Sequence, residues 1–152
     1  MPNNMPAMKY FDPEKSIGFL IYDVSRLMRR DFDRRVQALG LTQIQWRAIA
    51  HIARQEGCNQ ATLADQLEVK PITLTRLVDR LVESGWVVRQ PDPKDRRAVQ
   101  LHLTEISRPL LETMQEKSLQ TRAQALLGVG EDEFTVLFNT LKKMKSNLSK
   151  EN

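Results

Sequence analysis

The stretch that decides the fold runs from Leu63 to Thr104 and reads LADQLEVKPITLTRLVDRLVESGWVVRQPDPKDRRAVQLHLT. Its first apolar residues recur at helical spacing after Asn59, a residue suited to cap a helix, and so predict a short helix. A brief turn then leads to Pro71, which favours the first position of a second helix that ends before Gly85. The inward-facing residues predicted for that second helix are Leu74, Leu77, Val78, Leu81 and Val82.

A hairpin is predicted directly after the second helix. Residues 86–90 read as one strand, and Val99, Leu101 and Leu103 point to one face of another. A charged loop, stiffened by proline, separates the two strands. A short helix, a tight turn, a second helix and a two-stranded hairpin form the pattern of a winged helix-turn-helix. The predicted fold class is therefore mainly α with a small β-hairpin.

Two helices are predicted before this unit. The first spans residues 16–39, where apolar residues repeat at helical spacing. The second spans residues 43–55 and has an unusually well-marked start. Thr42 and Gln45 have the spacing of a capping box, and Trp46 has the spacing of a hydrophobic staple with the residue before the cap.

Two more helices are predicted after the hairpin. Helical spacing returns over residues 104–127, where Pro109 either kinks the helix or restarts it. The GVG sequence at residues 128–130 then breaks the chain. A last helix follows, acidic at its start and basic near its end, which complements the helix dipole. Its apolar residues are Phe134, Leu137, Phe138, Leu141, Met144 and Leu148.

Length and composition indicate one ordinary globular domain. The chain has 152 residues, 41% of them hydrophobic, and a net charge of +4, which favours an anionic partner. No apolar run approaches the ~18 residues of a membrane span, and the N-terminus lacks the pattern of an export signal. Cys58 is the only cysteine, so a disulfide within the chain is impossible. We expect a cytoplasmic protein without a cofactor.

The outward face of the second helix of the pair carries groups that can read DNA. In this fold that helix enters the major groove. Arg76 can make a bidentate contact with guanine, while threonines offer hydroxyls to phosphates or bases and methyls to thymine. A solvated face with chance arginines is the alternative. The residues left outside the predicted core are Thr73, Thr75, Arg76, Asp79 and Arg80.

The hairpin loop carries the second concentration of positive charge. A loop placed beside such a helix projects to one side of it, so Lys94, Arg96 and Arg97 are expected to reach the adjacent minor groove. We expect Asp92 and Asp95 to hold the arginines in place. The alternative is a polar hairpin tip that cancels its own charge.

The sequence resembles the MarR family of transcriptional regulators, and within it the SlyA-like branch. LTQIQWRAIAHI at residues 41–52, the quoted stretch at residues 63–104 and the flanking helices carry the resemblance, so it covers nearly the whole chain. The hairpin loop is the most specific part, because it is similar to the D-x-R-D-x-R pattern of the family. Here Lys94 replaces the first arginine of that pattern, while Arg97 keeps the second.

The resemblance implies roles for single residues and a quaternary structure. By it, Arg76 is the base reader of the recognition helix, and Arg97 is the minor-groove arginine supported by Asp95. It also implies a homodimer, which agrees with the need to place two recognition helices ~34 Å apart on a palindromic operator of double-stranded DNA. We expect a single domain over residues 1–152, with residues 42–103 binding DNA and the helices at residues 16–39 and 104–148 forming the dimer.

Members of this family commonly release DNA when a small aromatic or phenolic acid binds, which implies a repressor with such an effector. Arg26 and Trp46 are the candidate carboxylate partner and aromatic wall, near the junction of the first two helices. The structural alternative is a solvated arginine and a tryptophan that only packs at its helix start.

Other functions stay open as alternatives. Cys58 would serve a redox-responsive regulator, although it precedes the short helix, whereas peroxide sensors of the family carry the reactive cysteine in the N-terminal helix. A winged helix can also bind a protein instead of DNA. A metal site is disfavoured because His51 and His102 show no ligand spacing. An enzyme is disfavoured because the sequence has no glycine-rich phosphate loop and no evident pair of catalytic groups.

Overall fold

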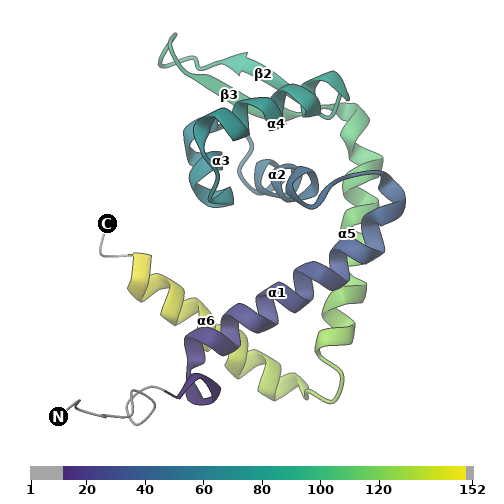
Figure 1. Ribbon diagram of the computed structural model, residues 1–152, viewed down its shortest axis with the longest axis vertical. Helices are drawn as coiled ribbons and strands as arrows, with labels where there is room; N and C mark the ends of the chain where they lie inside the picture. The colour runs from purple at the N-terminus through teal and green to yellow at the C-terminus, as the bar shows by residue number, and fades with distance from the viewer. Residues whose placement is uncertain (1–11, 150–152) are drawn as a thin grey trace, which may run out of the picture.

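The computed structural model describes residues 12–149 and shows a reading head with three longer helices extending from it (Figure 1). The head contains α2, α3, α4 and a small sheet, while α1, α5 and α6 form an open arm. In chain order the helices and strands are α1 (Ile17–Val36), α2 (Gln43–Arg54), β1 (Cys58–Asn59), α3 (Gln60–Leu67), α4 (Pro71–Glu83), β2 (Val87–Pro91), β3 (Val99–Leu103), α5 (Arg108–Ala125) and α6 (Glu131–Ser149). Short 3-10 turns lie at Pro13–Lys15, Gln37–Leu39 and Glu105–Ser107.

The predicted helix starts are confirmed by their capping contacts. The Thr42 hydroxyl accepts the backbone N–H of Gln45, and the Gln45 side chain accepts the backbone N–H of Thr42 at 2.9 Å. The Asn59 carbonyl oxygen accepts the N–H of Thr62 at 2.7 Å at the start of α3. Pro71 occupies the first turn of α4, where no N–H is needed. These local features fix where the three helices of the head begin.

The sheet has one strand more than the sequence predicts. Its strand order is β1-β3-β2, and both pairings are antiparallel. The predicted hairpin is β2 and β3, in which Val87 lies opposite Leu103. The additional strand β1 places Cys58 opposite Leu101. A two-residue strand is too short to show a periodic pattern in the sequence, so only its pairing with β3 identifies it.

The head holds most of the hydrophobic core. Ile49, Leu63, Leu81 and Leu101 are fully buried there, and Leu74 of α4 is nearly so. The arm joins this core at one end only, through Phe32 and Val36 of α1 and Leu110 and Met114 of α5. The lower parts of α1 and α5, and all of α6, lie away from it (Figure 1).

The structure corrects one detail of the sequence prediction, the inward position of Val82, and refines two others. Val82 is 37% exposed because it lies at the margin of the apolar stripe of α4 and not on its centre. Val99 is also 37% exposed, because it lies where the hairpin extends beyond the core, although it shares a strand with buried Leu101. Pro109 restarts the helix instead of kinking it, since α5 begins at Arg108 after the turn at Glu105–Ser107.

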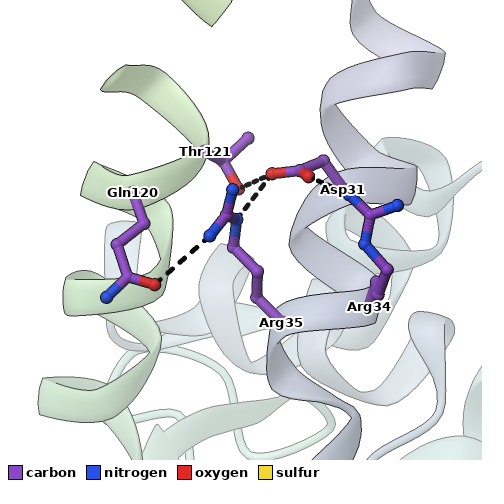
Figure 2. Close-up of polar contacts among 5 residues, drawn as sticks. All are labelled: Asp31, Arg34, Arg35, Gln120 and Thr121. Atoms are coloured by element: carbon purple, nitrogen blue, oxygen red, sulfur yellow. Dashed lines mark hydrogen bonds and ion pairs between the residues drawn. The ribbon is translucent and has the colours of Figure 1, made fainter. Parts of the chain in front are cut away.

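A polar cluster joins α1 to α5 below the head, and Figure 2 shows its five side chains. The Asp31 carboxylate accepts hydrogen bonds from Arg35 Nε at 2.6 Å and from the Thr121 hydroxyl at 2.8 Å, and it also pairs with Arg34. Arg35 further donates to the Gln120 side chain at 3.4 Å. Arg35, followed by Thr121, holds the pKa of Asp31 below its ordinary value. The cluster thus contributes a polar link between two helices of the arm.

The arm exposes many large apolar side chains. They lie on α1 and α6, which cross each other in Figure 1 and border a groove of about 480 Å³ lined mainly by Ile21, Leu141, Met144 and Leu148. None of the helices within residues 12–149 is long and apolar enough to span a membrane. The exposed apolar residues of the two helices are Ile17, Phe19, Leu20, Ile21, Tyr22, Val24, Leu27, Met28, Val136, Leu137, Phe138, Leu141 and Leu148.

Candidate nucleic-acid interface

α4 presents the predicted reading residues on its solvent face. Leu74, Leu77, Val78 and Leu81 are buried on its inner face. Thr73, Arg76 and Arg80 are exposed on the other side, and the two arginines are one helical turn apart. Neither guanidinium has an ion-pair partner within the described part of the chain, so both are free to contact an external anion.

Thr75 differs from Thr73 in how its hydroxyl is used. Thr75 is half-buried, and its hydroxyl donates to the backbone carbonyl of Pro71 at 3.0 Å. That bond uses the only hydroxyl hydrogen, so Thr75 offers a ligand its oxygen lone pairs and its methyl group. Thr73 is exposed on the first turn of α4, and its hydroxyl is available as donor and acceptor.

The sequence predicts Asp79 among the outward-facing residues of α4, but its carboxylate forms an ion pair with Arg89 of β2. Arg89 Nη2 lies 2.6 Å from Asp79 Oδ1, and Arg89 Nε donates to the Gln60 side chain at 2.9 Å. One guanidinium thus connects β2, α4 and α3. Half-exposed ion pairs contribute little to stability, so the main effect is to fix the hairpin against the two helices. No local sequence pattern signals a contact between residues ten apart across a turn.

The hairpin loop leaves its three cations unpaired. Lys94, Arg96 and Arg97 are exposed, and none has an ion-pair partner within residues 12–149. The expectation that Asp92 and Asp95 hold the arginine side chains needs correction. Asp92 Oδ1 accepts the backbone N–H of Lys94 at 2.8 Å, and Asp95 Oδ1 accepts that of Arg97 at 2.9 Å.

Short Asp side chains favour such bonds to the backbone two residues ahead, and the bonds stiffen the loop. A further pair of backbone bonds closes it, from Asp92 N–H to the Ala98 carbonyl at 3.1 Å and from Ala98 N–H to the Asp95 carbonyl at 3.0 Å. The carboxylates therefore shape the loop and leave the basic groups available.

α4 and the hairpin lie at the same end of the molecule, opposite α6 (Figure 1). An α-helix with side chains is ~10–12 Å wide, which matches the ~12 Å width of the major groove. Further cationic side chains beside such a helix can lie along the DNA backbone and reach the neighbouring minor groove. The width of α4 and the position of the hairpin at the same end of the molecule are compatible with binding to double-stranded DNA.

The structure does not bring the two predicted effector residues into one cavity. Trp46 is 8% exposed, its indole N–H donates to Asp33 at 3.1 Å, and it packs edge-on against Phe32 with ring centroids 4.5 Å apart. Arg26 lies on the solvent-facing part of α1, with its guanidinium 3.7 Å from Asp23. Neither Arg26 nor Trp46 lines the groove between α1 and α6 or the cavity that α2, α3 and α6 border.

Cys58 is buried, and His102 contacts two other side chains of the protein. Cys58 is 5% exposed, and burial raises the pKa of its thiol, which disfavours the reactive thiolate. His102 Nδ1 lies 3.1 Å from the Glu56 carboxylate, and its other nitrogen lies 3.1 Å from the Gln100 side chain. Among the described residues, no group of three or more His, Cys, Asp or Glu side chains is arranged to hold a metal ion.

Comparisons with known proteins identify the family. A model described as MarR family matches residues 39–98. The transcriptional regulator PA3341 is similar in structure, with 32% identity, a TM-score of 0.79, and coverage of 90% of this chain and 100% of the other. Apo MarR from E. coli shows 29% identity, a TM-score of 0.73 and coverage of 85% and 96%.

A MarR transcriptional regulator from Methanosarcina mazei Go1 shows 27% identity, a TM-score of 0.77 and coverage of 88% and 96%. These relatives are regulators of transcription, which confirms the prediction of a regulator and not of an enzyme. With its winged helix-turn-helix and flanking helices, the chain belongs to the MarR family of DNA-binding transcriptional regulators.

Proposed function

We propose that the protein acts as a homodimeric repressor on palindromic double-stranded DNA operators, and that it belongs to the SlyA-like branch of its family. The observation that carries this proposal is the set of unpaired cations on α4 and the hairpin loop, at the same end of the molecule. The loop sequence DPKDRR at residues 92–97, similar to the D-x-R-D-x-R pattern of the family, supports DNA binding by the hairpin.

Two arginines have different tasks in this proposal. Arg76, in the middle of the exposed face of α4, reads guanine through its planar fork of donors. Arg97, exposed on the hairpin loop, enters the minor groove, where it responds to groove width more than to base identity. Thr73, Thr75, Arg80, Lys94 and Arg96 contact the phosphates around them, while Asp95 fixes the loop through its bond to the Arg97 backbone.

The proposed dimer is supported by the apolar surface of the arm. Leu20, Leu27 and Phe138 are each about half exposed or more, at 63%, 52% and 51%. A continuous apolar surface of this kind on α1 and α6 is stabilised when a second copy covers it. A dimer then places two reading heads for the two halves of a palindrome.

A mobility-shift experiment at two salt concentrations tests DNA binding against the alternative of a protein-binding winged helix. The full chain is titrated into a palindromic duplex recovered by genomic footprinting and into a scrambled duplex of equal length. We expect tight binding to the first duplex, weaker binding to the second, and a steep loss of affinity with salt as counterions are released. A protein adaptor would show little affinity for either duplex at both salt concentrations.

The effector is proposed to be a small aromatic or phenolic acid whose carboxylate binds Arg26, whereas Trp46, which is buried against Phe32, is not assigned to this site. The exposed position of Arg26 on α1 supports this, since its weak contact with Asp23 leaves donors free. Salicylate is expected to quench tryptophan fluorescence and to release DNA, and Arg26→Ala should weaken both responses. Arg30→Ala, another exposed arginine of α1, is the matched control. An unchanged response in Arg26→Ala would remove Arg26 from the site.

A further inference from the structure

A second cavity lies between the reading head and the end of the last helix. Its volume is about 490 Å³, which is within the range of small-molecule sites. α2 contributes His51, Arg54 and Gln55 to its walls, α3 contributes Gln66, and α6 contributes Lys145. Three elements far apart in the sequence therefore meet around it.

The side chains that line this cavity are donors or cations and include no carboxylate. Arg54 and Lys145 have no ion-pair partner in the described part of the chain. Gln66 donates to the Gln55 side chain at 3.4 Å, which leaves further amide hydrogens unused. Burial, followed by the charges of Arg47 and Arg54, lowers the pKa of His51. Positive charge thus accumulates here without compensation from the protein.

We propose that this cavity binds a small hydrophilic anion with at least two negative charges on phosphate or carboxylate oxygens, bridging Arg54 on α2 and Lys145 on α6. Two cations on separate walls call for more than one charge on the ligand, and the neighbouring amides supply neutral donors for its remaining oxygens. The lining formed by the described residues contains no Val, Leu, Ile, Met, Phe, Tyr or Trp side chain, and its single ring is the imidazole of His51, so it suits a ligand with several charged oxygens better than a salicylate-like acid. The site is therefore separate from the proposed contact at Arg26.

Occupancy of the cavity would connect the head to the arm. His51, Arg54 and Gln66 move with the reading head, while Lys145 moves with α6. An anion that binds both restricts their relative position and thereby the distance between two recognition helices in a dimer. This effect on DNA rests on the proposed function, whereas binding of the anion itself does not.

Calorimetric titration of the full chain without DNA tests the site. Pyrophosphate and citrate are the probes with several negative charges, and they separate phosphate from carboxylate preference, while acetate and salicylate carry one charge each. We expect at least one of the first two to bind with a stoichiometry of one per chain. Arg54→Gln and Lys145→Gln should each weaken that binding about tenfold or more, because each removes a charge-assisted contact. Lys143→Gln, an exposed lysine of the same helix, should leave it unchanged.

The NMR titration of His51 provides a second readout that does not depend on affinity alone. A bound anion offsets the repulsion from Arg47 and Arg54, so the pKa of His51 should rise when the probe is present. Circular dichroism melting confirms that each variant is folded. Failure of all probes to bind, equal weakening in Lys143→Gln, equal binding of acetate, or an unmoved His51 pKa would each overturn the proposal. If DNA binding fails while pyrophosphate or citrate still binds, the proposed function is wrong and this site stands.

Discussion

The reading head and the arm of this protein differ in how much of their apolar surface is buried within one chain. In the head, Ile49, Ile52 and Leu81 are fully buried, whereas Leu20 and Leu148 of the arm are 63% and 73% exposed. Helices of both regions carry apolar residues at helical spacing, so this periodicity alone does not show whether an apolar face is buried within one chain. The head thus completes its core within one chain, whereas the arm leaves an exposed apolar surface that we propose a second copy covers.

The two regions also contain charged side chains that differ in whether they have ion-pair partners. In the arm, Asp31 pairs with Arg34 and Arg35. In the head, Arg76 on α4 and Arg97 on the hairpin have no ion-pair partner within residues 12–149. The head therefore satisfies its apolar groups internally and leaves its cations for an external anion.

The largest effect is expected from deletion of the chain from Glu131 onward, which removes α6. The apolar stripe from Phe134 to Leu148 is then missing from the proposed interface, so dimerisation should be lost. Operator affinity should fall by about 10²- to 10⁴-fold, the gain that two linked binding sites provide. Sedimentation velocity and mobility shift measure the two losses. An intact DNA-binding dimer after this deletion would show that the arm is not the interface.

The next largest effect is expected from Arg76→Ala. A lost bidentate contact with guanine should cost ~1–3 kcal/mol per half-site and relax preference at one symmetric pair of base positions. Neither folding nor dimerisation should change, because Arg76 is exposed on α4 and far in sequence from the arm. Binding to a panel of operator variants checks this. Uniform weakening across the panel would mean that Arg76 contacts phosphate and not a base.

A smaller loss of specificity is expected from Arg97→Ala on the hairpin loop. This change should weaken many sequences alike and lower the slope of log affinity against log salt by up to about 2 for a dimer, since each hairpin loses one cation. Titrations at several salt concentrations give the slope. Lys15→Ala, at an exposed lysine of the arm, is the control that should leave the slope unchanged. Unaltered affinity and slope in Arg97→Ala would make the hairpin a solvated surface.

The smallest effect is expected from Asp31→Asn in the polar cluster of the arm. Arg35 and Thr121 lower the pKa of Asp31 in the folded protein, so its contribution to stability is present above its ordinary pKa of about 4 and is lost as pH falls through the lowered value. The variant should therefore have a lower Tm at pH 7, and the difference should shrink toward pH 3. A difference independent of pH would remove the role assigned to the Asp31 charge.

The helices and the hairpin were predictable from sequence because their signals are local. Caps at Thr42 and Asn59, Pro71 at a helix start and the apolar periodicity all act within a few residues. The candidate DNA-contacting residues of α4 could also be predicted, because the residues not assigned to its buried face must lie on its exposed face. Arg76 and Arg97 are exposed as expected.

The features that the sequence did not predict depend on contacts between distant residues. Strand β1 exists through its pairing with β3, and the Asp79–Arg89 pair forms across a turn. The Asp31–Thr121 bond joins residues 90 apart. In the loop, an aspartate can bind either a neighbouring arginine side chain or a backbone N–H. The geometry shows that Asp95 accepts the backbone N–H of Arg97. The division of apolar residues between core and interface is likewise a property of the assembled chain.

The central claim is that the arm pairs two reading heads on one duplex, and selection from a pool of random-sequence duplexes tests it most directly. The full chain is incubated with the pool, and the bound DNA is sequenced after several rounds. The account predicts a palindrome whose half-site centres lie one helical turn, ~34 Å, apart or a multiple of it, with guanine at one symmetric pair of positions. Enrichment of a single unpaired half-site, or of no sequence at all, would contradict it.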